Sequence, residues 1–320
     1  MESKSIDLWL LENKTININD NSFYNNIIFP CARECITTHL KRNNYSRKDN
    51  VVVQEYIGNC VLNSINKIST IVPYKFINKT NKQWVNTILL YNQWGWERNQ
   101  KEIDNIYKKY DNIILDRVDT LIDYTNTNNH FKNVKCEIFS LNKTLGIGGG
   151  GLLWEDSKYV NFKSSNQYNK IFDLIDIDCK NFSFIDHLQK NNFDQLSSKL
   201  IYNLKNNDLK GLINFEMNYR KNNLKLLTES FVDQLPNWML ENCKSNDSFP
   251  GIFPIKLKNY NEKIIKELKD YFDLHTQFLN FNYSDNYLIY NWKQVLPIPL
   301  HSGINESKVI NIINYIKNHI

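Results

Sequence analysis

Short apolar runs alternate with mixed polar and apolar stretches along the first half of the chain. The apolar runs predict strands at residues 51–53, 70–76, 84–91 and 113–115. The mixed stretches have the spacing of helices and lie at residues 31–41, 59–68 and 102–110. Strands that are apolar on both faces, with helices between them, are typical of parallel sheets. The pattern therefore predicts an α/β domain with a mostly parallel sheet.

The last third of the chain has a different order of elements. Residues 218–233 predict a long helix that Pro236 would end, and residues 263–272 predict another. Residues 251–257 and 294–300 predict strands, and the prolines of the second suit an edge position. Asn305 is a candidate N-cap for a final helix whose apolar face holds Val309, Ile312, Ile313 and Ile316.

These patterns predict two domains. We expect a large α/β domain over residues 1–215 and a smaller α+β domain over residues 216–320. Residues 160–215 are polar, and we expect helices and loops there. The length of 320 residues and the hydrophobic content of 42% suffice for two cores of this kind.

Charge and cysteine content narrow the class of protein. The net charge of +5 is small, and without a basic block it gives little support for nucleic-acid binding. The six cysteines form no CxxC pair, which favours free thiols in a reducing compartment over disulfides or a metal site. We find no signal peptide and no run of roughly 20 apolar residues for a membrane span. We therefore expect a cytoplasmic protein without membrane insertion.

The most informative stretch joins a lysine to a run of glycines. Five of the ten glycines lie between residues 146 and 151, directly after Lys143, and strand-like segments flank the stretch on both sides. Gly146, Gly148 and Gly151 match the spacing GxGxxG of a nucleotide-binding loop, but that loop needs a helix after it, and the next residues resemble a strand. The alternative is a lysine presented beside a tight turn, where a dry pocket can make its amine a nucleophile.

Three further features support a site around Lys143. Asp116 ends a buried strand, where its carboxylate could bond the ring nitrogen of a pyridine cofactor. Ser140 lies three residues before Lys143, and its hydroxyl could contact a phosphate. Residues 30–34 open a helix, and the free N–H groups at a helix start form an anion site.

In this order, the features resemble the DegT/DnrJ/EryC1 family of pyridoxal-phosphate (PLP) sugar aminotransferases. PCARECI resembles the family's phosphate segment, VVVQEYIGNCVLNSI an early strand with its loop, and TILLYNQWG the "VHLYG" strand. IILDRVD resembles "IIEDAAH", FSLNKTLGIGGGGLLW the short "SLxK" form of the lysine loop, and VLPIPLHSGINESKVINIINYI the closing segment. The resemblance therefore covers six segments over most of the chain.

The resemblance implies PLP-dependent transferase fold type I and a role for each matching residue. Lys143 would carry PLP covalently and move the proton, and Asp116 would pair with the ring nitrogen. Ala32, Arg33 and Ser140 would help to hold the phosphate, and Tyr56 would stack on the ring.

The implied activity is that of an aminotransferase. Such an enzyme would move an amino group from an amino acid to a nucleotide-linked keto sugar for polysaccharide or glycoconjugate synthesis. Glutamate is the usual donor in the family. The resemblance also implies a homodimer.

Two departures from the family favour an alternative. Asp119 stands where the family has histidine or glutamine, and an acid there is a poor partner for the phenolate oxygen of the cofactor. We also identify no clear Asn-Tyr-Arg segment after the glycine run. The alternative is a catalytically impaired relative that keeps the fold for binding or assembly. A second alternative is a nicotinamide-dependent enzyme, which requires a helix directly after Gly151.

Overall fold

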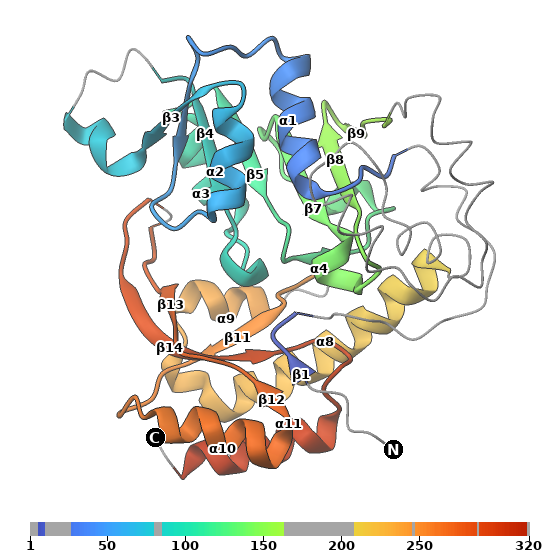
Figure 1. Cartoon of the computed structure of the whole chain (residues 1–320), viewed down its shortest axis with the longest axis vertical. Coiled ribbons are helices and arrows are strands. Elements are labelled where there is room, and N and C mark those ends of the chain that lie inside the picture. Colours follow the sequence, from blue (N-terminus) through green and yellow to red (C-terminus); the bar gives the residue numbers. More distant parts are fainter. Residues whose placement is uncertain are drawn as a thin grey trace.

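The computed structural model describes residues 6–9, 27–79, 85–162, 208–244, 247–286 and 288–318. The expectation of helices and loops after residue 160 lies almost wholly outside these ranges. The described chain has a large sheet with helices on both faces and, beside it, a smaller layer of strands and helices (Figure 1).

A seven-stranded sheet forms the framework of the larger part. Its order is β3-β2-β4-β5-β7-β8-β9; β8 and β9 are antiparallel to their neighbours, and all other pairs are parallel. The strands are β2 (Asn50–Val53), β3 (Thr70–Pro73), β4 (Thr87–Tyr91), β5 (Asn112–Asp116), β7 (Cys136–Ser140), β8 (Gly151–Glu155) and β9 (Lys158–Tyr159). This order confirms the predicted α/β class and the mostly parallel sheet.

Helices cover the two faces of this sheet because alternate strand residues point to opposite sides. Val51 and Val53 pack with helices α1 (Ala32–Arg42) and α2 (Asn59–Asn66), whereas Val52 packs with α3 (Gln100–Tyr107) on the other face. All three valines are almost fully buried, as expected for a strand covered on both sides. The apolar triplet 51–53 was therefore a reliable strand signal.

The smaller part is built on a three-stranded antiparallel sheet. Its order is β11 (Ile252–Ile255), β14 (Trp292–Pro299) and β13 (Leu279–Asn282). The edge position predicted for residues 294–300 is therefore wrong, because β14 lies in the centre. The prolines are tolerated because β13 pairs only with residues 292–295 of β14, so Pro297 and Pro299 pair with β11 alone.

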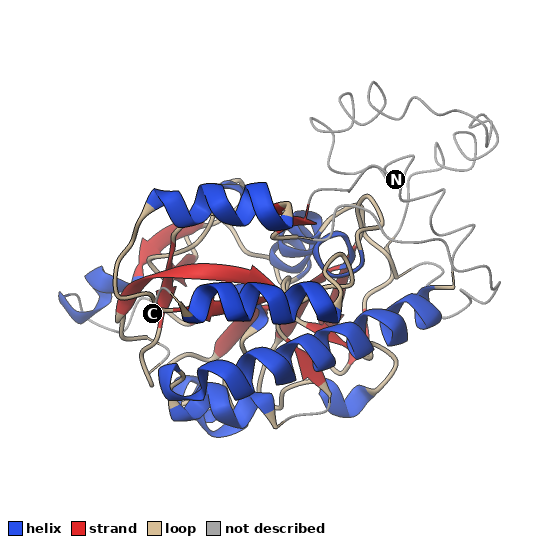
Figure 2. Cartoon of the chain, turned by 90° about the horizontal axis from the view of Figure 1, so that it is seen from below, coloured by secondary structure: helices blue, strands red, loops and turns tan. Residues whose placement is uncertain are grey.

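Four helices pack against the three-stranded sheet and its surroundings (Figure 2). They are α8 (Leu209–Phe231), α9 (Asn237–Cys243), α10 (Glu262–Phe272) and α11 (Glu306–Lys317). Asn305 caps α11 as predicted, with its side chain accepting from the Lys308 N–H at 2.9 Å.

Helix α8 belongs to both parts of the molecule. Near its start, Leu209, Leu212 and Ile213 pack with residues of β7 and β8, whereas Leu224 and Leu227 lie in the core of the smaller part. The helix begins at Leu209, ahead of the predicted residue 218, so the proposed domain boundary at residues 215 and 216 falls inside it. Contacts of one continuous helix with both cores join the two parts.

Short pairings tie the remaining segments to this frame. Strand β1 (Ile6–Asp7) lies parallel to β12 (Leu274–His275), and β6 (Leu121–Ile122) lies antiparallel to β10 (Ser248–Phe249). The first pairing brings the N-terminal residues 6–9 against the smaller part, close to the short helix α4 (Leu141–Leu145) (Figure 1).

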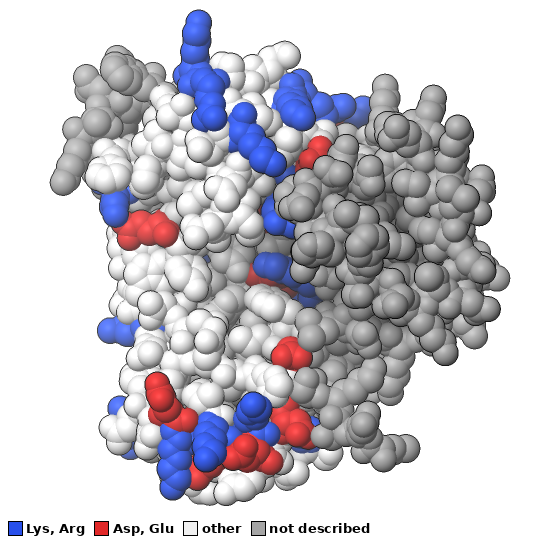
Figure 3. Space-filling model, in the orientation of Figure 1, with Lys and Arg blue, Asp and Glu red and all other residues white. Residues whose placement is uncertain are grey.

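The charged surface of the described residues is mixed in sign. On the face in Figure 3, acidic and basic side chains gather together over α10 and α11 at the lower end. Within the described ranges, no helix combines the length and apolar character that a membrane span requires.

Candidate functional site

Polar side chains gather where three neighbouring parallel strands end. Tyr91, Asp116 and Ser140 are the last residues of β4, β5 and β7, and Tyr91 pairs directly with Asp116 in the sheet register. The carboxyl ends of parallel strands lie at one edge of the sheet, which is where α/β folds bind ligands. Asp116 and Ser140 therefore lie at the same edge of the sheet.

Lys143 follows this edge directly, on α4 rather than on the predicted loop. Ser140 is the N-cap of α4, and its Oγ accepts from the Lys143 N–H at 3.4 Å. The helix ends at Gly146, whose φ of 64° is in the left-handed region that glycine adopts without a steric cost. A cap three residues before Lys143 and a glycine three residues after it explain why one turn of helix forms here.

The rest of the glycine run leads into a strand. Strand β8 begins at Gly151 itself, so the helix that a GxGxxG loop requires is absent from this described segment. The nicotinamide-dependent alternative is therefore rejected. Gly151 has a different function: an added Cβ would lie 2.7 Å from the Ala32 nitrogen. Only glycine lets the start of α1 approach β8 this closely.

The start of α1 offers N–H groups at the same end of the sheet. Ala32 and Arg33 are its first two residues, and their N–H groups have no carbonyl partner within the helix. The N-cap, Cys31, contributes no side-chain hydrogen bond. Contacts of α1 with β7 and β8 place this helix start beside the strand that carries Ser140. The arrangement suits a phosphate group.

The amine of Lys143 lies among acidic and aromatic groups. Its Nζ is 3.0 Å from Asp119 Oδ1 and 4.9 Å from the centre of the Trp9 ring, and 37% of the side chain is exposed. Burial lowers the pKa of Lys143, but the carboxylates of Asp119 and Asp116 outweigh it and raise that pKa. Trp9 carried no sequence signal, because only the pairing of β1 with β12 brings it to the site.

Asp116 is fully buried beside this lysine. Burial raises the pKa of its carboxyl to about 7 despite the charge of Lys143, which acts in the opposite direction. Oδ1 accepts from the Val118 N–H at 3.2 Å. A carboxyl with such a pKa gains and loses its proton near neutrality, so it can share a proton with a basic ring nitrogen.

Tyr56 is not among these groups. Its side chain is 41% exposed, and its ring packs on Trp292, the first residue of β14, with 5.1 Å between the ring centres. With Gln54 and Tyr91 it also lines a small cavity of about 30 Å³. The structure therefore places Tyr56 toward the smaller part rather than against Lys143.

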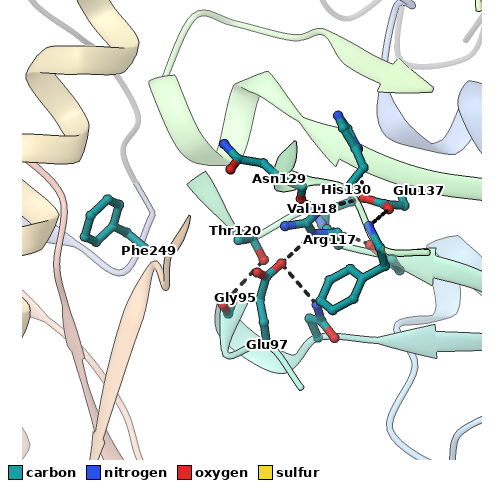
Figure 4. A network of polar contacts seen from close by, with 12 residues as sticks. Gly95, Glu97, Arg117, Val118, Thr120, Asn129, His130, Glu137 and Phe249 are labelled. Carbon is teal, nitrogen blue, oxygen red and sulfur yellow. Dashed lines mark hydrogen bonds and ion pairs between the residues drawn. The ribbon is translucent and has the colours of Figure 1, made fainter. Parts of the chain in front are cut away.

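Arg117, next to Asp116, serves a separate buried cluster (Figure 4). Its guanidinium pairs with Glu97 and Glu137, and it also donates to the Asn129 carbonyl at 2.9 Å. His130 Nδ1 lies 3.1 Å from the same Glu137. Two carboxylates compensate the buried guanidinium, so Arg117 forms a structural ion cluster.

Arg220 belongs to an Asn-Tyr-Arg segment that the sequence analysis did not identify. The statement that the chain lacks an Asn-Tyr-Arg segment is wrong, because Asn218, Tyr219 and Arg220 form one within α8. It was missed because it lies much further along the chain than the glycine run. The buried Arg220 donates to the carbonyls of Asp119, at 3.3 Å, and Thr144, at 3.2 Å. It thereby links the loop after β5 to the helix that carries Lys143.

This combination of fold and site defines a class. A mixed, mostly parallel seven-stranded sheet with helices on both faces is the framework of PLP-dependent transferase fold type I. Solved structures share this fold. A protein from Streptococcus pneumoniae described as "Putative sugar aminotransferase", in its PMP form, has a TM-score of 0.57 at 10% identity, covering 96% of this chain and 93% of that one.

Two further solved structures agree. An aminotransferase from Psychrobacter cryohalolentis has a TM-score of 0.55 at 12% identity, with 91% of this chain and 86% of that one covered. A DegT/DnrJ/EryC1/StrS aminotransferase from Brucella abortus has a TM-score of 0.54 at 12% identity, with coverages of 91% and 84%. At these identities the likeness shows the fold alone. No curated protein matches the sequence.

Residues 12–319 match the model of a family described as "Putative PLP-dependent aminotransferase". The match spans nearly the whole chain, and the chain belongs to that family. Its cofactor is accordingly PLP, and an amino donor and an amino acceptor are its substrates.

Proposed function

We propose that this protein transfers an amino group from an amino acid, glutamate, to a nucleotide-linked keto sugar, with Lys143 as the residue that carries PLP. The observation that supports this most is the position of Lys143 directly after β7, beside the buried Asp116. The sugar substrate rests on the sequence resemblance. We propose a homodimer on the same basis.

The residues at the edge of the sheet fit PLP. The first N–H groups of α1, at Ala32 and Arg33, and the hydroxyl of Ser140 would hold the phosphate. Asp116 would face the ring nitrogen and keep a proton there, because its pKa of about 7 allows both protonation states near neutrality. Tyr56 would lie at the margin of the site, because its ring packs on Trp292.

Lys143 would perform the proton transfers. When bound, PLP withdraws electrons from the carbon that carries the transferred amino group. The Nζ atom of Lys143 would take the proton from that carbon and deliver it to the C4′ carbon of the cofactor. Trp9 would limit the access of water to this nitrogen, since its ring lies 4.9 Å away.

The impaired relative remains the second candidate, favoured by the ion pair between Asp119 and Lys143. Its other support, a missing Asn-Tyr-Arg segment, is removed by residues 218–220.

A panel of nucleotide-linked keto sugars, incubated with glutamate and PLP, would separate the two functions. We expect release of 2-oxoglutarate with at least one sugar and none from the Lys143→Ala variant. PLP uptake without 2-oxoglutarate release on any sugar or other keto acceptor would contradict an active aminotransferase.

A further inference from the structure

Asp119 occupies a position for which the proposed function gives no role. Its side chain is fully buried, and each carboxylate oxygen contacts one group. Oδ1 lies 3.0 Å from Lys143 Nζ, and Oδ2 accepts a hydrogen bond from the Tyr91 hydroxyl. Arg220 fixes the backbone of the same residue through its carbonyl at 3.3 Å. Tyr91 therefore holds one carboxylate oxygen, Arg220 holds the backbone, and the other carboxylate oxygen faces the lysine.

The groups that face Lys143 or its partner Asp119 come from five elements. Asp116 of β5 and Cys60 of α2 act on the charge of Lys143, and the Trp9 ring of the N-terminal segment lies 4.9 Å from its Nζ. Tyr91 of β4 and Arg220 of α8 contact Asp119. Burial raises the pKa of Asp116 to about 7, so at neutral pH this carboxyl is protonated for much of the time. Burial also raises the pKa of Tyr91, so its hydroxyl remains a neutral donor. Asp119, with its Oδ1 at 3.0 Å, is the carboxylate in direct contact with the ammonium group of Lys143.

We propose that Asp119 is the positioning residue and counter-ion of Lys143, holding its nitrogen in place and in the charged form before and after PLP is attached. This inference rests on the proposed function. A buried carboxylate 3.0 Å from a nitrogen stabilises the protonated state of that nitrogen. Asp119 would thereby favour the protonated form of the lysine nitrogen when PLP is attached. Free PLP can react only with the neutral amine, so its capture requires Lys143 to lose its proton.

The test is a pH titration of the visible absorbance of the PLP-loaded protein. An opposite charge at this distance changes a pKa by about 1–3 units. Asp119→Asn should therefore lower the midpoint of the absorbance titration by about 1–3 pH units. This corresponds to an approximately 10- to 1000-fold loss of proton affinity at the lysine nitrogen. Asp123→Asn is the matched control: Asp123 lies in the same connection between β5 and β7 but bonds Thr125. Its midpoint should equal that of the wild type.

A second measurement does not require the variant to fold. The rate at which wild-type apoprotein captures PLP should keep rising with pH up to and beyond about 10.5, the ordinary pKa of lysine. A plateau well below that pH would overturn the role of Asp119, and so would equal midpoints in Asp119→Asn and wild type. A wild type that takes up no PLP at all would overturn both the inference and the proposed function.

Discussion

Replacement of Arg220 by methionine tests how the lysine helix is held in place. Methionine keeps much of the volume of this 1%-exposed side chain but removes every donor. The carbonyls of Asp119 and Thr144 lose a charged partner, at about 1–3 kcal/mol each. The guanidinium charge is itself costly to bury, and burial lowers the pKa of Arg220 for this reason. Removing that charge therefore offsets part of the loss in stability. We therefore expect a loss of about 3 kcal/mol, a large part of a typical stability of about 5–15 kcal/mol.

The assay for this loss is urea unfolding followed by circular dichroism. Arg220→Met should lower the midpoint of unfolding without a change in slope. Lys225→Met is the control on the same helix: the Lys225 side chain is 74% exposed and pairs only with Glu229, at 3.9 Å, among the described residues. This variant should remain within about 0.5 kcal/mol of the wild type. An Arg220→Met variant as stable as the Lys225→Met control would refute the account of α8 as the link between the two site segments.

Two more predictions concern the surroundings of the site and the sheet. PLP added to the apoprotein should quench the tryptophan emission of the wild type more than that of Trp9→Phe, because Trp9 lies 4.9 Å from the Lys143 amine; equal quenching would place Trp9 elsewhere. Burial raises the pKa of Glu155, but hydrogen bonds from His39 and Arg42 outweigh it and lower that pKa to about 2. The resulting stabilisation should be present above about pH 4.5 and lost as the pH falls toward about 2. The difference in unfolding free energy between wild type and Glu155→Gln should narrow over that range, and a constant difference would contradict the assignment.

Local sequence predicted those elements that local forces determine. The apolar triplet 51–53 and the cap at Asn305 were sufficient because strand burial and capping act over a few residues. The central position of β14 was not predictable, since its prolines are accommodated only by the short reach of β13. The sequence predicts a loop around Lys143 because the glycines that follow outweigh the signal of a one-turn helix capped by Ser140.

Some residues of the candidate site could likewise be identified from the local sequence, whereas others could not. Lys143, Asp116 and Ser140 could be identified from their places relative to strands, and the structure brings them to one edge of the sheet. Trp9 and Arg220 reach the site only through tertiary packing, from the N-terminal segment and from α8. Asp119 was noticed as a departure, but its direct contact with Lys143 depends on a loop conformation that no local pattern encodes.

The central claim is that Lys143 carries PLP, and the visible absorption spectrum of the purified protein tests it most directly. Wild-type protein incubated with PLP and freed of excess cofactor should retain the absorbance of a lysine-bound chromophore, and borohydride should fix the label on Lys143. The Lys143→Ala variant should fold and lose that absorbance. A colourless wild type, or a variant that keeps the same spectrum, would contradict the account.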